Sequence, residues 1–532
     1  MARLSDLFFN ISHRRLLGIA FLAALAESLL LVILVGYDRG IGTDGAFYSL
    51  SGYNLFRGLG FTYSDVPNTF TWPLLSIFTG FLSLFLDDLQ LCMHIVLTAA
   101  FAFGVLPFYG LVKNIMDEKA ARIGLVMYVL NGFLMRMSTR MTAESLLVFF
   151  VILSAYYFSV LITDLRRGNV PSMWKYGCTG LSLGLAYLTK PEGFLFFAFG
   201  TAFLLFFTIR RGMMTVSWFR LIILLVLFVA TIAPQILFIH RNTGKWELTT
   251  YNRFLFRGYV EPLLTLSPGD AAANRKVEYN YNAYIVRGPY TAENLTKDIR
   301  KTPDHLAKYF RGIWTLVGPL CLFGLLLSFF FSDWRRGPRG LVYSYLFPVL
   351  GVFFWYNPTE RMFLAFLPFF IVVTLYSILQ LNGRWSGRPW RRAAIMGLLG
   401  LSIAFSFRPI SNNSPTNAVI GNHRLMGQWI RRNLPEMEGK LLADRKPYIA
   451  FDARALYYRY TSVRDYETLI DRLKKDNVEY LIVDDFYTRT KNPGVVGLLD
   501  AKDTPDLKFI HKEEDPTWGL AILYKVIKES AN

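Results

Sequence analysis

Apolar runs of about twenty residues recur along most of this chain, and they limit its fold more than any other feature. The chain has 532 residues, of which 53% are hydrophobic and 18% are charged. A soluble protein would carry roughly 25% charged residues. The low charge excludes a disordered or coiled-coil chain, and the apolar runs predict a polytopic α-helical membrane protein.

Positive charge is concentrated in short segments between the apolar runs. Residues 408–532 hold 20 Lys and Arg against 18 Asp and Glu, so +16 of the net charge of +18 lies in the first 407 residues. Six segments with 19 Lys and Arg against 5 Asp and Glu supply most of it: 1–15, 113–122, 163–175, 210–220, 332–339 and 382–392. Such loops are typical of the cytoplasmic side of a membrane, so no nucleic-acid partner is expected.

Eleven spans place all six basic segments in the cytoplasm, with the N-terminus inside and the C-terminus outside. The predicted spans are residues 16–36, 91–112, 121–137, 144–162, 176–189, 193–209, 219–239, 313–331, 341–356, 361–381 and 393–407. The apolar stretch 72–86 is short, and counting it as a span would move later basic segments outside. We therefore expect it to lie in the interface or to re-enter. An uncleaved signal anchor at residues 16–36 favours a bacterial inner membrane.

Two domains are predicted. Residues 1–407 form the transmembrane domain, with outer loops at 37–71 and 240–312. Residues 408–532 follow a linker-like stretch, Asn412-Asn413-Ser414-Pro415, and read as helices at 422–433 and 465–476 with strands at 480–483 and 520–524. This predicts a small α/β domain outside the membrane. It carries no phosphate-binding loop or dinucleotide motif, so no chemistry is assigned to it.

Two carboxylates follow the first span in a Gly-rich, turn-forming stretch. They are Asp38 and Asp44, six positions apart. One interpretation makes either of them a general base that deprotonates an acceptor hydroxyl. The other makes them a capping and a solvated aspartate at the start of a loop. The residues alone favour the second interpretation.

Charged residues also gather at the predicted outer ends of spans. Arg140 and Glu144 are four apart and are expected to share one helix face. The others are Lys190 and Glu192 at a two-helix corner, Glu360 and Arg361 at the start of a span, and Arg257 in the second outer loop. Each alone is typical of an interfacial side chain or a local ion pair. Together the cations suit a phosphate or pyrophosphate. His240 has no second ligand nearby, so no metal site is expected.

Several motifs occur in an order and spacing that resemble a known family. They are Asp44 with Tyr48, Phe56–Thr62, Thr71-Trp72-Pro73, Ser138–Glu144, Leu188–Gly193 and Glu360-Arg361 through Leu367-Pro368. The chain resembles membrane glycosyltransferases of the GT-C fold that use polyprenyl-phosphate sugars. The similarity is to the branch with protein O-mannosyltransferases and the aminoarabinose transferase of lipid A.

The resemblance implies a direct, inverting displacement at the anomeric carbon, with no metal and no cofactor. It puts Asp44 at the position of the base, with Asp38 as the rival. Four residues are then candidates to contact the donor phosphate: Arg140, Lys190, Arg361 and Arg257. Four more are candidates to bind substrate: Tyr48, Glu144, Glu192 and Glu360. The expected partners are a polyprenyl-phosphate sugar, a glycan, lipid or protein acceptor, and membrane lipids.

Two other functions stay open. A lipid-linked glycan flippase or transporter would carry charges within its spans and broken helices in two related halves. The polar residues of this chain cluster at one face, and its halves are not alike. A polymerase or ligase that uses polyprenyl-pyrophosphate glycans would employ the same outer basic residues, and only the Asp44 context and the attached domain disfavour it.

Overall fold

The computed structural model describes residues 10–35, 37, 41–248, 311, 314, 323–328, 339–346, 360–384, 390–407, 421–460, 465–516 and 519–528. The chain divides into two compact units. The first, here called the helical unit, comprises Met1–Gly36, His94–Leu255 and Ala292–Ser414. The second, called the sheet unit, comprises Tyr37–Met93, Phe256–Thr291 and Pro415–Asn532.

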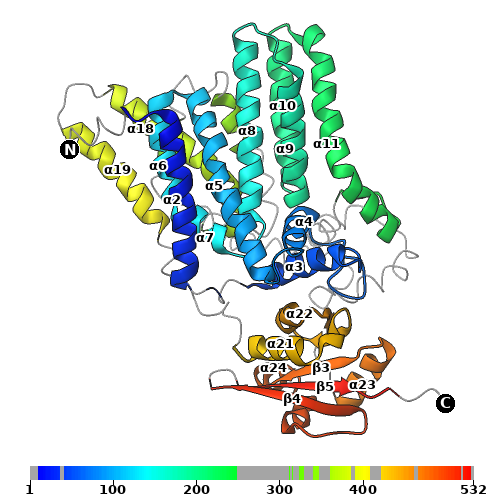
Figure 1. Ribbon diagram of the computed structural model, residues 1–532. Helices are drawn as coiled ribbons and strands as arrows, with labels where there is room; N and C mark the ends of the chain where they lie inside the picture. Colours follow the sequence, from blue (N-terminus) through cyan, green and yellow to red (C-terminus); the bar gives the residue numbers. More distant parts are fainter. Residues whose placement is uncertain are drawn as a thin grey trace, which may run out of the picture. The chain divides into compact units, whose positions relative to one another are not determined.

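The helical unit is built from long apolar helices. Its described elements are α2 (His13–Val35), most of α5 (Leu89–Ile115), α6 (Glu118–Val129), α7 (Gly132–Thr139), α8 (Glu144–Arg166), α9 (Met173–Thr189), α10 (Gly193–Arg210), α11 (Met214–Thr243), the 3-10 helix η5 (Glu360–Phe366), α18 (Leu367–Arg384) and α19 (Trp390–Ser406). Helix α9 packs against α8, α10 and α11, and these four helices lie side by side in Figure 1.

Six of the described helices are long and apolar enough to cross a membrane. They are His13–Leu34, Leu89–Ile115, Glu144–Arg166, Gly193–Arg210, Ser217–Thr243 and Phe363–Gln380, and each overlaps a predicted span. Helices α9 and α19, with 17 residues each, overlap two more predicted spans. The predicted spans 313–331 and 341–356 lie mostly outside the described residues.

The predicted span 121–137 is bent, because the chain breaks there into α6 and α7. The two helices meet at an angle of 50°, and together they are long and apolar enough to count as a seventh span. The side chain of Asn131 accepts hydrogen bonds from the backbone N–H groups of Phe133 and Leu134, so it caps a new helix at this point.

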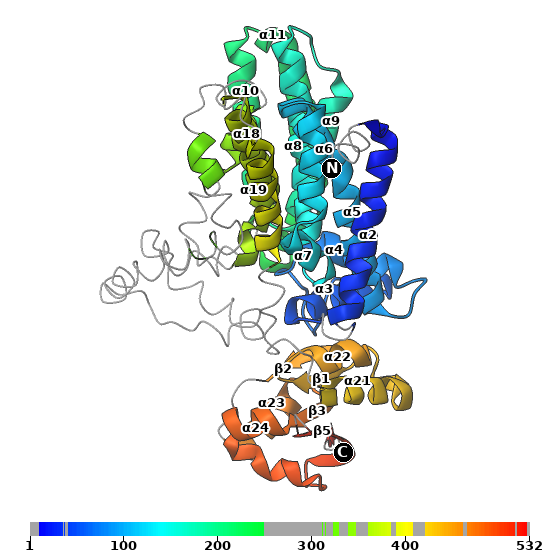
Figure 2. The same ribbon diagram turned by 90° about the vertical axis from the view of Figure 1, so that its left-hand side faces the viewer.

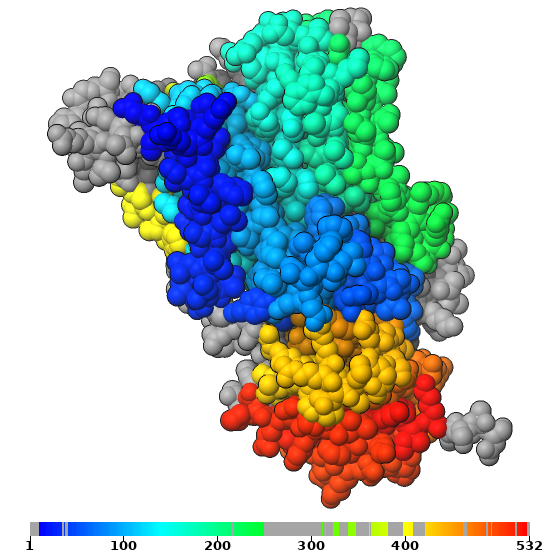
Figure 3. Space-filling view, in the orientation of Figure 1, coloured from blue at the N-terminus to red at the C-terminus, as the bar shows by residue number. Residues whose placement is uncertain are grey.

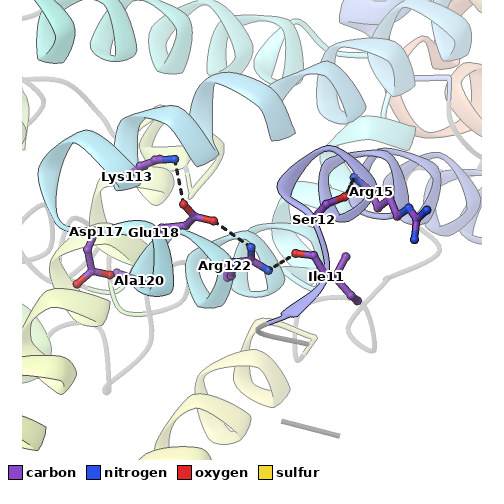
Figure 4. A network of polar contacts seen from close by, with 8 residues as sticks. All are labelled: Ile11, Ser12, Arg15, Lys113, Asp117, Glu118, Ala120 and Arg122. Carbon is purple, nitrogen blue, oxygen red and sulfur yellow. Dashed lines mark hydrogen bonds and ion pairs between the residues drawn. The ribbon is translucent and has the colours of Figure 1, made fainter. Parts of the chain in front are cut away.

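A polar network joins two segments that were predicted to be cytoplasmic. Lys113 Nζ lies 3.1 Å from Glu118 Oε2, and Arg122 Nη2 lies 2.9 Å from Glu118 Oε1. Arg122 also donates from Nη1 to the carbonyl oxygen of Ile11 at 2.9 Å, as Figure 4 shows. The Arg122 residue is 6% exposed, so its charge is largely covered by these contacts. Ile11 and Arg122, which belong to two different basic segments, are therefore neighbours in the structure.

The sheet unit combines two short helices from residues 37–93 with the C-terminal domain. Its elements are α3 (Thr43–Phe56), α4 (Pro73–Leu82), α21 (Gly421–Asn433), the 3-10 helix η7 (Pro435–Met437), β1 (Leu441–Asp444), α22 (Tyr448–Ala453), β2 (Leu456–Arg459), α23 (Tyr466–Lys475), β3 (Tyr480–Asp484), α24 (Asp485–Lys491), the 3-10 helix η8 (Pro493–Asp500), β4 (Leu507–Asp515) and β5 (Gly519–Val526). The predicted C-terminal α/β domain is present.

The five strands form one mixed sheet in the order β2-β1-β3-β5-β4. Strand β1 runs parallel to β2 and β3, whereas β5 runs antiparallel to β3 and β4. Figure 2 shows the sheet with α23 and α24 beside it. Its core includes Leu469 and Leu473 of α23 and Leu481, Val483 and Ile522 of the strands, all of them buried. The domain thus has a hydrophobic core of its own.

The first outer loop is more ordered than the sequence predicts, because the turn-forming stretch after Gly42 is the helix α3. All residues of α3 from Gly45 to Asn54 are buried. Helix α4 begins with Pro73 at its first position and has only ten residues, which is too short to span a membrane. A Cβ atom added at Gly52 would clash with the carbonyl oxygen of Ser76, so the two helices touch through glycine.

Candidate functional site

A buried ion pair ties the end of α9 to the start of α8. Glu144 is the first residue of α8 and is 2% exposed. Lys190 follows the last residue of α9, and its Nζ lies 3.0 Å from Glu144 Oε1. Burial lowers the pKa of the Lys190 ammonium, but the Glu144 and Glu192 carboxylates outweigh burial and raise the pKa above its usual value. Lys190 is therefore positively charged at neutral pH.

Two further charges complete this group, here called the Lys190 cluster. Arg361 Nε lies 3.7 Å from Glu144 Oε1, and Glu192 Oε1 lies 3.9 Å from Lys190 Nζ. The side chain of Arg361 is 40% exposed, against 15% for Lys190 and 12% for Glu192. Two cations and two carboxylates balance, so the cluster is formally neutral. It offers hydrogen-bond donors to an anion, but no excess positive charge.

The turn that carries Lys190 depends on a glycine. Gly193 donates a backbone hydrogen bond to the Lys190 carbonyl at 3.0 Å and begins α10. A Cβ atom at Gly193 would collide with the backbone of Ala186 and Tyr187 in α9. Only glycine lets the two helices approach this closely, and this close turn places Lys190 and Glu192 beside α8.

The predicted shared helix face of Arg140 and Glu144 is wrong. Arg140 follows the end of α7 in an extended conformation, with φ −83° and ψ 132°, whereas Glu144 begins α8. Within the described part of the chain, Arg140 makes no ion pair. The four-residue spacing spans a break between two helices, so helical periodicity does not apply to it.

Asp44 lies in the first turn of α3. The residue before the helix, Gly42, provides no side-chain cap, and Asp44 is half-buried. A carboxylate in the first helical turn is stabilised by the helix dipole. Tyr48 lies one turn further on the same face and is buried, with 6% exposure. Asp44 is thus held on a helix in the sheet unit, whereas the Lys190 cluster belongs to the helical unit.

Asp38 and Arg257 lie outside the described residues, and the side chain of Glu360 is likewise not described although its backbone begins η5. Among the residues that the structure describes, no group of three or more His, Cys, Asp and Glu side chains is arranged to hold a metal ion.

A buried polar group in the C-terminal domain was not predicted from the sequence. Asp444 and Asp484 end the parallel strands β1 and β3, and both are almost completely buried. Burial, followed by the nearby Asp484 carboxylate, raises the pKa of Asp444 well above its usual value. His423 of α21 is also fully buried, with Nε2 3.9 Å from Asp484 Oδ2. In the sequence, each of these aspartates directly follows a short apolar run, and this pattern could have indicated two buried strand ends.

The comparisons with known proteins concern both sequence and fold. Residues 77–238, which include Glu144, Lys190 and Glu192, match the family model described as dolichyl-phosphate-mannose-protein mannosyltransferase. No curated protein sequence matches the chain.

Solved structures resemble nearly the whole chain. ArnT from Cupriavidus metallidurans in the apo state matches with a TM-score of 0.61 at 9% identity, over 96% of this chain and 97% of ArnT. ArnT bound to undecaprenyl phosphate matches with a TM-score of 0.58 at 10% identity, over 97% and 98%. The oligosaccharyltransferase AglB from Archaeoglobus fulgidus, in complex with an inhibitory peptide and a dolichol-phosphate, matches with 0.53 at 14% identity, over 96% and 74%. The chain therefore has the GT-C fold, and its family-model match supports a glycosyltransferase enzyme that depends on a polyprenyl-phosphate sugar.

Proposed function

We propose that this protein transfers a sugar from a polyprenyl-phosphate donor to a hydroxyl or amine acceptor, with inversion, at the outer face of the membrane. The Lys190 cluster is the observation that carries this proposal. It brings Lys190, Glu144 and Arg361 together from three chain segments, and two of the three lie within the matched family region. A protein of the same fold, ArnT, has been solved with undecaprenyl phosphate bound.

On the donor side, the Lys190 cluster binds the phosphate through hydrogen-bond donors. The Lys190 ammonium has three N–H donors. One of them donates a hydrogen bond to Glu144, so the others remain for a phosphate oxygen. Arg361 adds a planar guanidinium, which suits phosphate geometry. Negative charge grows on the phosphate as the glycosidic bond breaks, and fixed cations in a partly buried site stabilise that charge. Glu144 holds both cations close together.

On the acceptor side, Asp44 acts as the general base. The acceptor oxygen or nitrogen attacks the anomeric carbon while its proton passes to the Asp44 carboxylate. The bond from the anomeric carbon to the phosphate oxygen breaks in the same step, and polyprenyl phosphate leaves. No covalent enzyme intermediate forms, so the configuration at the anomeric carbon inverts. Asp38 is the alternative base.

The test is a transfer assay with the purified full-length chain in lipid nanodiscs. A panel of polyprenyl-phosphate sugars serves as donors, and the release of free polyprenyl phosphate and the anomeric configuration of the product are measured. We expect Asp44→Asn to lower the rate by about a hundredfold or more, as for loss of a general base. Asp65→Asn, which changes an exposed aspartate of the same loop, is the control and should be unaffected.

Three outcomes would contradict the proposal in different ways. Full activity of Asp44→Asn would transfer the role of base to Asp38. Release only from polyprenyl-pyrophosphate glycans would identify a polymerase or ligase. Movement of a lipid-linked glycan across the nanodisc or liposome membrane without release of polyprenyl phosphate would identify a flippase.

The proposed orientation rests on the basic segments, which would lie in the cytoplasm of a bacterial inner membrane. Arg122 supports it, since its contact with Ile11 holds two of these segments together. Single cysteines introduced at Lys508 and at Lys119 test it in intact cells after Cys92, Cys178 and Cys321 are replaced. We expect a membrane-impermeant thiol reagent to label position 508 and spare position 119; the reverse pattern would invert the topology.

A further inference from the structure

The helix that carries Asp44 is attached to the C-terminal domain. The first-loop segment, residues 41–93, and the C-terminal segment, residues 421–528, belong to one compact unit. Within it, α3 packs against α22. Figure 3 shows the border between them, where the blue residues of the first-loop segment meet the yellow and orange residues of the C-terminal segment. The candidate base is therefore built on the same unit as the sheet.

The start of α3 touches the first residue of α22. Thr43 Oγ1, one residue before Asp44, lies 3.4 Å from the hydroxyl oxygen of Tyr448. Burial raises the pKa of Tyr448, the hydrogen bond with Thr43 partly opposes this rise, and the nearby Asp44 carboxylate adds to it. Gly42 gives α3 no side-chain cap, and the contact with Tyr448 helps to hold this end of the helix.

The other end of α3 is held through Tyr53. Its hydroxyl donates a hydrogen bond to Glu438 Oε1 at 2.5 Å, and the guanidinium carbon of Arg454 lies 5.0 Å from the centre of its ring. Arg454 also donates from Nη2 to the carbonyl oxygen of Asp87 at 2.7 Å. Arg431 forms an ion pair with the same Asp87. The contacts at this end thus reach from α3 to the end of the first-loop segment.

Arg454 occupies a position that would suit a glycine. It ends α22 with a φ of 59°, in the left-handed region that side chains other than Gly, Asn and Asp rarely adopt. It is also 5% exposed, so a cation is buried there. Both features are unfavourable for arginine, and the contacts of its guanidinium with Tyr53 and Asp87 offset them.

The middle of α3 contacts the edge of the sheet. The ring of Phe47 stacks on Tyr63 at 4.2 Å and lies 5.9 Å from Tyr457 of β2. The backbone N–H of Tyr457 donates to the carbonyl oxygen of Tyr63 at 2.7 Å. Strand β2 is one of the two edge strands, and the first-loop segment contacts the edge that β2 would otherwise expose.

We propose that the C-terminal domain is a positioning domain, which holds α3, and with it Asp44, at the orientation that the transfer step needs. Tyr448, Tyr53 and Arg454 are the positioning residues. The inference rests on the proposed role of Asp44 as base. It assigns the C-terminal domain to the acceptor half of the reaction, whereas the Lys190 cluster serves the donor half.

Two tyrosines provide a matched test. Tyr53→Phe removes a hydroxyl that donates to Glu438 at 2.5 Å across the two segments. Tyr458→Phe removes a hydroxyl that donates to Asp476 at 2.5 Å within the C-terminal segment alone. Each variant loses one bond from tyrosine to a carboxylate, so their costs to folding are comparable. Only Tyr53→Phe loosens α3. Arg454→Lys is the second positioning variant, because it keeps the charge but loses the guanidinium geometry.

We expect Tyr53→Phe and Arg454→Lys to lower kcat about tenfold, since small errors in the placement of a catalytic group are costly. The KM for the polyprenyl-phosphate donor should stay within about twofold, because the Lys190 cluster is untouched. Tyr458→Phe should keep both constants. Amide hydrogen exchange in residues 43–56 should be faster in Tyr53→Phe than in Tyr458→Phe.

The inference is overturned if the Tyr53 and Tyr458 variants lose activity equally, or if neither Tyr53→Phe nor Arg454→Lys changes kcat. Asp44→Asn assayed in parallel separates this failure from that of the proposed function. An active Asp44→Asn refutes Asp44 as base, whereas an inactive Asp44→Asn with fully active positioning variants refutes only the role of the domain.

Discussion

Lys190 Nζ lies 3.0 Å from Glu144 Oε1, and this contact joins the end of α9 to the start of α8. A second pair, Lys175 with Asp164 at 2.6 Å, joins the opposite ends of the same two helices. The pairs share their chemistry and their helices, but only the first belongs to the candidate site. They therefore allow the contribution of a lysine to donor binding to be separated from its contribution to helix packing.

Lys190→Ala should raise the KM for the polyprenyl-phosphate donor by about tenfold or more, because a charge-assisted hydrogen bond to phosphate is lost. Lys175→Ala should leave that KM unchanged. The measurement is steady-state release of polyprenyl phosphate by both variants. An equal rise in both would show that the lysines act through the packing of α8 on α9 and would remove Lys190 from the donor site.

Glu144→Gln should destabilise the protein more than the double variant Glu144→Gln/Lys190→Gln. Removing one partner of a buried ion pair costs about 3–5 kcal/mol, because the other charge stays buried. In the double variant both positions are neutral, so neither leaves an unpaired buried charge. We expect thermal unfolding to show the double variant recovering most of the lost stability while its transfer activity stays low. Recovered activity would contradict a direct role for Lys190 at the phosphate.

Gly52→Ala should destabilise the sheet unit by about 1–3 kcal/mol, because the new methyl group meets the Ser76 backbone of α4. The displaced α3 carries Asp44, so kcat should fall as well. Gly18→Ala is the control, since Gly18 lies inside α2 and an added Cβ would meet no atom within 4 Å beyond its chain neighbours and the adjacent helix backbone. It should keep or raise stability, as alanine favours a helix. Thermal unfolding and transfer rates measure both effects.

The stability of the sheet unit should depend on pH through Asp452. Burial raises the pKa of this carboxyl to about 7, although Arg424 and Arg454 lie near it. The unfolded chain has the ordinary lower pKa, so the native state binds more protons between about pH 4 and pH 7. The stabilising contribution is complete below this range and is lost as the pH rises through 7.

Asp452→Asn removes this titration and keeps the shape of the side chain. Compared with the unmodified protein, the variant should therefore gain thermal stability as the pH is raised from 5 to 8. Unfolding curves of both proteins at the two pH values test this. A constant difference between them would show that Asp452 does not titrate in this range.

The length of the apolar runs and the position of the basic residues were sufficient to predict most of the membrane-spanning helices. Lipid surroundings require long apolar helices, so six described spans follow directly from the sequence. The bend between α6 and α7 was missed because one polar residue, Asn131, starts a new helix within an apolar run. The same kind of break separates Arg140 from Glu144.

Contacts between distant segments account for most of the other omissions. The sequence placed Lys190 and Glu144 at the ends of spans, but their pairing across 46 residues comes from the packing of α8 on α9. In the C-terminal domain, α21, α23, β3 and β5 were predicted, whereas β1 and β2 have only four residues each and show no alternation. Helix α3 was missed because its glycines and polar residues resemble a loop, and its burial comes from contacts with α4 and α22.

The hydrogen bond from the Tyr457 N–H to the Tyr63 carbonyl also bears on how such enzymes can be recombined. A hybrid made by exchanging only the C-terminal domain would leave the edge of β2 against a foreign loop, and poorly matched strand edges invite aggregation. Residues 41–93 and 421–528 would have to be exchanged as one cassette, although they lie in distant parts of the gene. For the same reason, compensating substitutions among relatives should link these two regions.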